Sequence, residues 1–347
     1  MNKLKSSLLS ICVLCFMALC WTTMSAQGSK ARGDVDMDGS VTISDVTVLN
    51  DYLLGSRDVT INQAGADTNR DGTIDIGDVA VLIDYLLSGE WPYVPEPVTF
   101  TVNGVSFNMI PVSGGTFMMG GRDNDPYVRP WEFPVHQVTV SDFYIGETEV
   151  TQALWKAVMG SNPSWFQYSS NSDYAYTNDF QRPVEKVTYA NCLSFISKLN
   201  QKTGKTFRLL TEAEWEFAAR GGNRSRGYFY SGSDDIDEVS WYGDNSTVYL
   251  PNAGRSEKMP HAVATKAPNE LGIYDMSGNV EEWTSDWYGL YTDEPQTNPT
   301  GPATGTARIV RGGSWDQAFR MSRPTYRHEG WPTSPNIHIG LRIAMAM

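Results

Sequence analysis

The sequence is poor in cysteine, in histidine and in positive charge. Only four of its 347 residues are cysteine, and three of these, Cys12, Cys15 and Cys20, lie in the apolar stretch near the N-terminus. A chain that has lost this stretch keeps Cys192 alone and can form no internal disulfide. We therefore expect core packing and other non-covalent contacts, rather than disulfides, to hold such a chain together.

Acidic residues outnumber basic ones by 40 to 27, which gives a formal net charge of −13. Removal of residues 1–26, which carry Lys3 and Lys5 and no acid, takes this charge from −13 to −15. Most of the excess lies in residues 33–90, where 12 acids stand against Arg57 and Arg70. A surface of this sign disfavours nucleic acid and anionic membranes as partners.

The N-terminus has the pattern of an export signal. Two lysines precede an apolar run from Leu8 to Leu19, and small residues follow up to Ala26. This pattern predicts a signal peptide over residues 1–26 and a secreted or cell-surface protein. Lipid anchoring at Cys20 is the alternative, although Leu19 stands where a small residue is expected. The run is too short for a comfortable membrane span, and no other apolar stretch of the sequence reaches that length.

Two twelve-residue segments, 34–45 and 67–78, repeat one pattern with an offset of 33 residues. Oxygen-bearing side chains stand at positions 1, 3, 5, 9 and 12, and position 6 is Gly39 or Gly72. Such spacing lets several oxygens converge on a hard cation such as Ca²⁺, with position 7 contributing its carbonyl. Two copies predict two calcium sites rather than acidic turns. The predicted ligands are Asp34, Asp36, Asp38, Ser40, Thr42 and Asp45, and Asp67, Asn69, Asp71, Thr73, Asp75 and Asp78.

An amphipathic helix is expected after each loop, over residues 46–55 and 79–88, because apolar residues recur there at helical spacing. Position 12 is Asp45 or Asp78 instead of the Glu that is usual in an EF-hand. This repeated loop and helix resembles a dockerin, the calcium module that attaches secreted bacterial enzymes to cohesin-bearing scaffolds. The resemblance covers residues 33–90 and implies a small all-α module with two bound Ca²⁺ and a cohesin partner. The residues that would contact the cohesin are Ile43, Ser44, Ile76 and Gly77.

A proline-rich linker is expected over residues 91–98 and a large domain over residues 99–347. Helices of the large domain are expected after three capping residues, Thr151, Thr188 and Thr211. The second of these helices carries Cys192 in an apolar stripe, which indicates a buried structural thiol rather than a nucleophile. Strands are expected over residues 100–105, 107–112, 137–140, 143–147 and 307–311.

Seven blocks carry most of the recognisable pattern in the large domain. They are Ile145–Thr151, Arg182–Tyr189, Phe207–Gly221, Pro268–Trp283, Asn298–Pro302, Arg311–Trp315 and Ile339–Arg342. In this order they resemble the formylglycine-generating enzyme, or sulfatase-modifying factor, family, over essentially all of residues 107–345. The resemblance implies an irregular, C-type-lectin-like α+β fold with little regular secondary structure.

The segment 275–282 matches the buried calcium site of that family. By this resemblance, one Ca²⁺ would be held by the side chains of Asp275 and Glu282 and by the carbonyls of Gly278 and Val280. Two carboxylates and two carbonyls form a hard-oxygen site of the kind that calcium takes. The alternative is that Asp275 and Glu282 only cap turns.

The resemblance stops at the catalytic residues. Enzymes of the family use two cysteines, one two residues and the other seven residues beyond the aromatic that follows Gly-Gly-Ser. Counted from Trp315, these positions are Gln317 and Ser322. An amide and a hydroxyl cannot take over the thiolate chemistry that binds copper and activates oxygen, so copper is not expected. The histidines show no metal-ligand spacing either; they are His136, His261, His328 and His338.

The segment that follows corresponds to the substrate groove of the family. The candidate groove residues are Gln317, Ser322, Arg323, Tyr326 and Trp331. Aromatic residues there would stack on a sugar or hold a peptide, and packing in the core accounts for them equally well. Three functions stay open. We favour a dockerin-tethered, catalytically silent domain that binds a peptide or a glycan. The others are an active formylglycine-generating oxidase and an accessory component of polysaccharide or sulfated-polysaccharide degradation.

Overall fold

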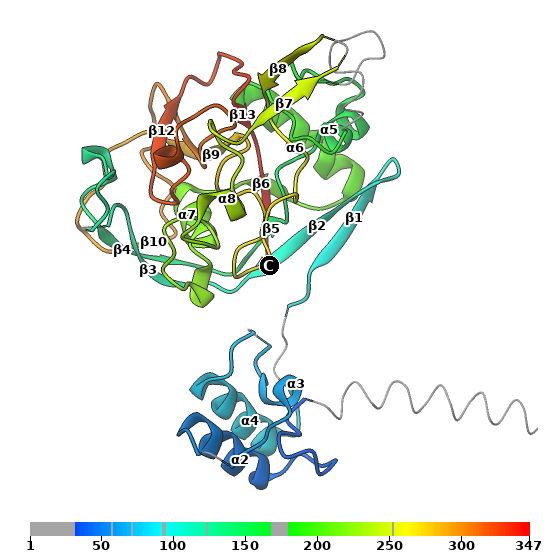
Figure 1. Ribbon diagram of the computed structural model, residues 1–347, viewed down its shortest axis with the longest axis vertical. Helices are drawn as coiled ribbons and strands as arrows, with labels where there is room; N and C mark the ends of the chain where they lie inside the picture. The colour runs from blue at the N-terminus through cyan, green and yellow to red at the C-terminus, as the bar shows by residue number, and fades with distance from the viewer. Residues whose placement is uncertain are drawn as a thin grey trace, which may run out of the picture. The chain divides into compact units, whose positions relative to one another are not determined.

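The computed structural model describes residues 32–347 except for 57, 71, 92–94, 123, 168–179 and 252. The predicted signal peptide and part of the predicted linker lie outside the described residues. The chain divides into two compact units, Met1–Pro95 and Glu96–Met347 (Figure 1). Among the described helices, none has both the length and the apolar character that crossing a membrane requires.

The first unit is built from helices around a small apolar core. Its elements are α2 (Ile43–Leu53), the short α3 (Gln63–Ala66) and α4 (Ile76–Ser88). The core takes residues from both halves of the repeat: Val35, Val46, Leu49, Ile61, Ala66, Val79 and Leu82. The two repeats therefore share one core, as the matching apolar faces of the two predicted helices required.

Both long helices begin three residues earlier than predicted. Thr42 and Asp75 are the N-caps, and each forms a capping box with the aspartate three residues later, Asp45 or Asp78. The last residues of each calcium loop therefore form the first turn of the helix that follows. A Thr-x-x-Asp pattern in the sequence already carries this signal.

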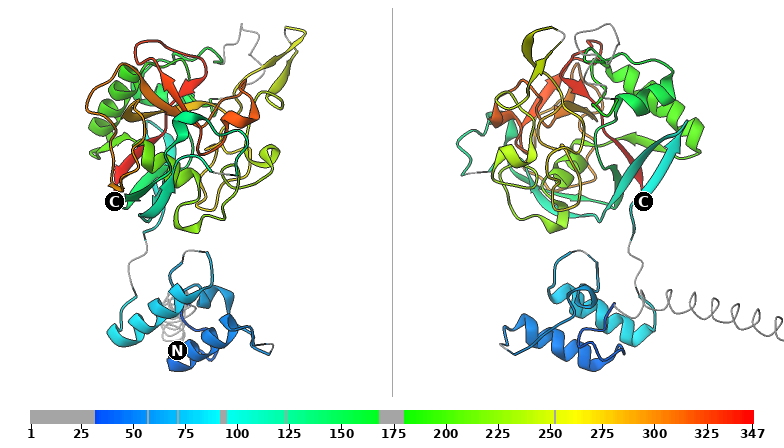
Figure 2. Two further views of the ribbon diagram at one scale, coloured as in Figure 1. Left: turned by 90° about the vertical axis from the view of Figure 1, so that its left-hand side faces the viewer. Right: turned by 45° about the vertical axis from the view of Figure 1, so that its right-hand side comes forward.

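The second unit contains an antiparallel five-stranded sheet in the order β1-β2-β5-β14-β6. Its strands are β1 (Val98–Val102), β2 (Val105–Val112), β5 (Phe143–Gly146), β14 (Ile343–Ala346) and β6 (Phe207–Leu209). The first and the last strands of the unit thus lie in one sheet, which closes the domain on itself. Figure 2 shows the β1–β2 hairpin and the C-terminus at the end of β14.

Within the described residues of this unit, three smaller sheets and four α-helices accompany the five-stranded sheet. One sheet has the order β10 (Gln296–Thr297), β4 (His136–Val140), β3 (Gly115–Met119). The second has the order β12 (Arg327–Gly330), β11 (Arg308–Arg311), β9 (Glu281–Trp287), β13 (Ile339–Gly340), and the third pairs β7 (Thr247–Leu250) with β8 (Arg255–Lys258). The helices are α5 (Gln152–Met159), α6 (Tyr189–Thr203), α7 (Glu212–Ala219) and α8 (Ile236–Val239).

The predicted helices of this unit are present with the predicted caps, Thr151, Thr188 and Thr211. The first predicted strand ran through residue 105, whereas the structure has a hairpin turn at Asn103-Gly104 between β1 and β2. Both turn residues have positive φ, 49° and 81°, which is the backbone that an Asn-Gly hairpin turn adopts. The Asn-Gly pair in the sequence already indicated this turn, and the predicted strand was wrong to continue through it.

Candidate functional site

The first loop gathers three carboxylates. One oxygen each of Asp34, Asp36 and Asp38 lies within 4.8 Å of the others, and no other trio of acidic, histidine or cysteine ligands in the described part of the chain does so. Gly39 has a φ of 88°, which turns the backbone at position 6. The Gly39 N–H donates to Asp34 Oδ1 at 3.4 Å, and Ser40 N–H donates to Asp38 Oδ1 at 2.7 Å. The loop is therefore wound around its own acidic side chains.

Asp45, at position 12, is fully buried and ties the two ends of this loop together. Its Oδ1 accepts from the N–H groups of Val35, at 2.7 Å, and Asp36, at 3.1 Å. Its Oδ2 accepts from the N–H of Thr42 at 2.8 Å. These bonds hold position 12 beside positions 2 and 3, which is the closure that a calcium loop needs.

The second loop repeats most of these bonds 33 residues later. The carboxylate of Asp78 accepts from the N–H of Asn69 at 3.0 Å and from the N–H of Asp75 at 2.9 Å. Asp67 Oδ2 accepts from the N–H of Gly72 at 3.0 Å, as Asp34 does in the first loop. The predicted ligand Asp71 lies outside the described residues. The equivalence of the bonds supports one geometry for both loops.

The predicted contact residues for a partner lie at the start of α2 and α4. Ile43 and Ile76 are 69% and 71% exposed, which is unusual for isoleucine in a small domain. Ser44 is half-buried and donates to Asp36 Oδ2 at 2.7 Å, so its hydroxyl also supports the loop. Exposed apolar residues at equivalent positions of both repeats suit a partner that buries them.

In the large domain, the four residues predicted to bind calcium lie at one tight loop. Asp275 and Gly278 have φ angles of 58° and 80°, so the backbone winds sharply before β9. Asp275 and Glu282 are buried. Glu282 forms an ion pair with Arg342 at 2.7 Å and accepts from Trp215 Nε1 at 2.7 Å. Part of its bonding capacity is therefore already used by protein groups.

A third buried carboxylate, Glu149, joins this loop. Its Oε1 accepts from the N–H of Val280 at 3.0 Å, and its Oε2 accepts from Asn279 Nδ2 at 2.8 Å. Burial, followed by the charges of Asp275 and Glu282, raises the pKa of Glu149 well above its ordinary value. Burial also raises the pKa of Asp275, to about 6. These three carboxylates are buried around one loop, although their oxygens do not all lie within 4.8 Å of one another. The sequence prediction missed Glu149, which lies in the block 145–151.

Ser322, at the position of the second family cysteine, is fully buried. The Ser240 hydroxyl lies 3.4 Å from its hydroxyl, and the Ser277 hydroxyl donates to its carbonyl at 2.7 Å. Gln317, at the position of the first cysteine, is half-buried, and its backbone carbonyl accepts from the N–H of Gly243 at 2.8 Å. This donor set of hydroxyls and an amide does not fit copper, which needs soft thiolate ligands.

The candidate groove residues differ in exposure. Arg323 is buried, forms ion pairs with Asp125 and, at 2.8 Å, with Glu132, and donates to Thr325 Oγ1 at 2.8 Å. Tyr326 is also buried, whereas Trp331 is 59% exposed and lines a surface hollow of about 470 Å³. Of the five candidates, Trp331 is thus the one with a largely exposed side chain. The sequence could not show the ion pairs of Arg323, because they join residues 191 and 198 positions apart.

Cys192, His261 and His328 lie in three different environments within the large domain. Cys192 is fully buried, and burial raises the pKa of its thiol far above the ordinary range. His261 stacks on Trp241, with ring centroids 3.7 Å apart, and burial lowers its pKa to about 4. His328 Nδ1 lies 3.1 Å from Glu281, and this hydrogen bond raises its pKa. None of these groups forms a nucleophile–base pair in the described structure.

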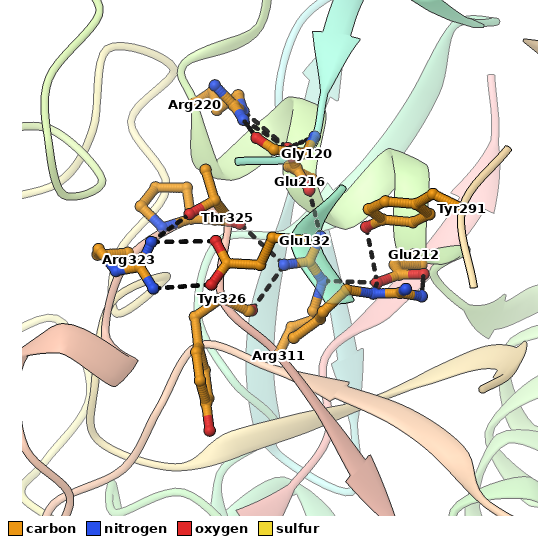
Figure 3. A network of polar contacts seen from close by, with 12 residues as sticks. Gly120, Glu132, Glu212, Glu216, Arg220, Tyr291, Arg311, Arg323, Thr325 and Tyr326 are labelled. Atoms are coloured by element: carbon orange, nitrogen blue, oxygen red, sulfur yellow. Dashed lines mark hydrogen bonds and ion pairs between the residues drawn. The ribbon is translucent and has the colours of Figure 1, made fainter. Parts of the chain in front are cut away.

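A polar network connects α7 to the strand β11 and the segment after Ser322. Glu216 is fully buried; burial acts to raise its pKa, but Arg220 and Arg311 hold it below the ordinary value. Arg311 forms an ion pair with Glu216 and donates to the carbonyl of Tyr326 at 2.6 Å (Figure 3). Because buried charges are stable only when paired, this network fixes the backbone of the candidate groove.

The sheets, the caps and the calcium-type loop define a C-type-lectin-like domain of the sulfatase-modifying type, preceded by a calcium-loop module. The model of the sulfatase-modifying factor enzyme 1-like domain matches residues 97–347, and that of the dockerin type I domain matches residues 32–87. The chain belongs to the sulfatase-modifying factor family and carries an N-terminal dockerin type I module. Dockerin type I modules bind calcium, in agreement with the two predicted loops.

Similar proteins carry different names. The chaperone protein LppX of Paenibacillus barcinonensis is 33% identical over 265 residues, 64% of this chain and 83% of that protein. A formylglycine-generating enzyme of Streptomyces coelicolor is 30% identical over 287 residues, 67% of this chain and 87% of that protein. Among solved structures, Treponema denticola variable protein 1 is 30% identical, with a TM-score of 0.61, and covers 73% of this chain and 100% of its own. Fold and family membership therefore leave the activity to be argued from the site.

Proposed function

We propose that this is an exported modular protein whose dockerin attaches it to a cohesin-bearing scaffold and whose large domain binds a ligand without oxidising it. The ligand is a peptide or a glycan. The N-terminal export pattern and the exposed Ile43 and Ile76 support the first part. On a scaffold of polysaccharide-degrading enzymes, such a domain would act as an accessory component of polysaccharide or sulfated-polysaccharide breakdown.

The observation that carries the proposal is the pair of residues at the family's cysteine positions, Gln317 and Ser322. Formylglycine formation needs a thiolate to hold copper and to exchange with the substrate cysteine. The remaining thiol of the mature chain, Cys192, is buried and its pKa is raised, so it is neither accessible nor ionised. A hydroxyl and an amide do not bind Cu(I). The domain would therefore have the fold of the family but not its redox ligands.

One calcium ion in the large domain is part of the proposal. The residues that would hold it are the side chains of Asp275 and Glu282 and the carbonyls of Gly278 and Val280. The burial of Glu149, Asp275 and Glu282 around one loop supports a cation there; burial, followed by the charges of Asp275 and Glu282, raises the pKa of Glu149, and burial raises the pKa of Asp275 to about 6. The ion would fix the loop before β9 in place and supply no redox chemistry.

The test is to expose the purified protein to immobilised glycans and peptides and, in parallel, to titrate it with Cu(I). The proposal expects retention on a defined glycan or peptide. It also expects no more Cu(I) uptake than is shown by a control protein that has no copper site. Tight binding of Cu(I) with a defined stoichiometry would overturn it in favour of the oxidase. Binding to neither library would reject the ligand-binding role and leave the dockerin assignment standing.

A further inference from the structure

A cavity of about 290 Å³ lies on the large domain, apart from the residues considered so far as a groove. It is formed where α7 begins, where β9 ends and where the loop 289–302 folds over both. Its lining includes no residue of the set Gln317, Ser322, Arg323, Tyr326 and Trp331. The polar groups at its base come from Glu212, Asp286, Tyr291 and Arg327.

The charges at the base of the cavity neutralise one another. Glu212 forms an ion pair with Arg327 at 2.6 Å and with Arg311 at 3.2 Å, and it accepts from the Tyr291 hydroxyl at 3.1 Å. Figure 3 shows Glu212, Tyr291 and Arg311 converging in this way. Arg327 Nη1 donates in addition to the carbonyl of Gly289 at 2.8 Å. Of these charged groups, Glu212 and Arg327 line the cavity and pair with each other, whereas Arg311 does not line it and also pairs with Glu216.

Asp286 adds a second carboxyl group to the lining of the cavity. Its Oδ2 accepts from the N–H of Glu212 at 3.0 Å and from the Ser285 hydroxyl at 2.9 Å. Burial, followed by the charge of Glu212, raises the pKa of Asp286 to about 7. Near neutral pH a large share of this carboxyl is therefore protonated, and it can both donate and accept a hydrogen bond.

The cavity is lined by both apolar and polar side chains. Apolar surface comes from Met119, Trp287, Leu290, Pro299 and Pro302, and the rim carries Thr292, Gln296 and Thr300. Hydroxyl and amide groups above apolar walls suit a molecule with C–H faces and several hydroxyls. A charged molecule would lose its hydration without gaining a counter-charge, which is costly.

We propose that this cavity binds one uncharged sugar ring, with its hydroxyls on Asp286, Gln296 and Thr300. A cavity of about 290 Å³ is at the lower end of the range for ligand pockets, which limits the occupant to a single ring. This inference rests on the proposed function in that the large domain acts as a binding module. It goes further by naming the ligand class and the site.

The test uses saturation-transfer difference NMR on the purified protein. The probes are D-glucose, D-galactose, D-mannose and D-xylose, with D-galacturonate and D-glucosamine as charged counterparts. Thr300→Trp places a large side chain at the exposed rim and is expected to close the mouth of the cavity. Thr297→Trp is the matched control, because Thr297 is equally exposed, lies three residues away and does not line the cavity.

We expect saturation transfer to at least one neutral sugar, at least a tenfold weaker affinity in Thr300→Trp, and no change in Thr297→Trp. The charged probes should give no signal. The inference is overturned if no neutral sugar binds, if both tryptophan variants bind equally, or if a charged probe binds as well as a neutral one. A glycan or peptide that binds independently of Thr300→Trp would sink this inference while leaving the proposed function intact. Copper-dependent oxidation would instead reject the proposed function itself.

Discussion

The hydroxyl of Ser240 lies 3.4 Å from the hydroxyl of Ser322, and both residues are fully buried. By the resemblance described above, Ser322 is predicted to stand at the position where enzymes of this family carry a thiolate. Two hydroxyls in a buried contact satisfy each other and offer nothing that Cu(I) prefers over water. Gln317, at the other predicted cysteine position, differs in this respect, because its buried Oε1 has no hydrogen-bond partner within the described residues.

The first prediction concerns the thiol content of the folded protein. The mature chain should not react with a thiol reagent such as Ellman's reagent until it is unfolded, and then through Cys192 alone. The reason is that Cys192 lies on the buried face of α6, where burial suppresses the thiolate. Rapid reaction in the native state would show an accessible thiol and would reopen the question of a displaced nucleophile.

The second prediction concerns calcium. Calorimetry on the whole protein should show two calcium ions in the dockerin module and one in the large domain. Asp34→Ala and Asp67→Ala should each remove one site, because position 1 supplies a carboxylate oxygen that no neighbour replaces. Chelation should unfold the module, since its core is small and its acids repel one another without the metal.

Ser40→Ala is the matched control for this experiment. Ser40 stands at position 7, where the loop would use the backbone carbonyl, so removal of the hydroxyl should leave the calcium stoichiometry unchanged. Loss of a site in Ser40→Ala, or its retention in Asp34→Ala, would contradict the predicted ligand set. A circular dichroism spectrum that is unchanged by chelator would show that the module folds without calcium.

The third prediction concerns the cohesin partner. Ile43→Asp combined with Ile76→Asp should abolish binding to a type I cohesin, because it places charge in an apolar contact on both halves of the repeat. Each single variant should keep most of the affinity, since the near-repeat offers two binding orientations. Leu290→Asp, at an equally exposed position of the large domain, should have no effect. Surface plasmon resonance against a panel of purified cohesins measures this, and undiminished capture of the double variant would reject the surface.

Glu185 gives a pH-dependent stability. Its side chain is fully buried, and Oε2 has no hydrogen-bond partner within the described residues. Burial raises the pKa of its carboxyl to about 7, although hydrogen bonds from the N–H groups of Phe166 and Trp165 and the charges of Lys186 and His338 act in the opposite direction. The folded state therefore holds a proton that the unfolded state releases at lower pH.

The fourth prediction follows from this difference. Between the ordinary pKa of a glutamate and about pH 7, the contribution of Glu185 to stability should fall as the pH rises, because the folded state binds more protons than the unfolded state. Glu185→Gln should be more stable than the parent at pH 8, by up to about 3 kcal/mol, and equal to it near pH 4. Urea unfolding at both pH values measures the difference. A variant that is destabilised more at pH 8 than at pH 4 would show that Glu185 is needed in its ionised form.

Short-range patterns in the sequence predicted the parts of the fold that local chemistry decides. The spacing of Asp34, Gly39 and Asp45 specified the calcium loop, because one loop supplies all the ligands. Capping threonines specified where helices begin, since the cap bonds only to the next turn. The predicted strand over residues 100–105 failed at Asn103-Gly104, where a two-residue turn signal was overrun by an apolar run.

Contacts between residues far apart in the chain could not be predicted from local sequence patterns. The sequence predicts Arg323 to be a groove residue. In the structure it forms ion pairs with Asp125 and Glu132, which come from another part of the chain. The cavity above Asp286 likewise needs α7, β9 and the loop 289–302 together, and no local pattern brings them to one place. The roles of Arg323 and of the residues that line the cavity depend on charge, burial and proximity. These three properties arise only in the folded domain.

The central claim is that the domain has the family fold without the family reaction. Its most direct test is mass spectrometry of a sulfatase-type peptide containing Cys-x-Pro-x-Arg after incubation with the purified protein, Cu(I), a reductant and oxygen, beside an authentic formylglycine-generating enzyme. The account predicts an unmodified cysteine with this protein and conversion with the authentic enzyme. Conversion of the cysteine to formylglycine that depends on both the protein and oxygen would contradict it.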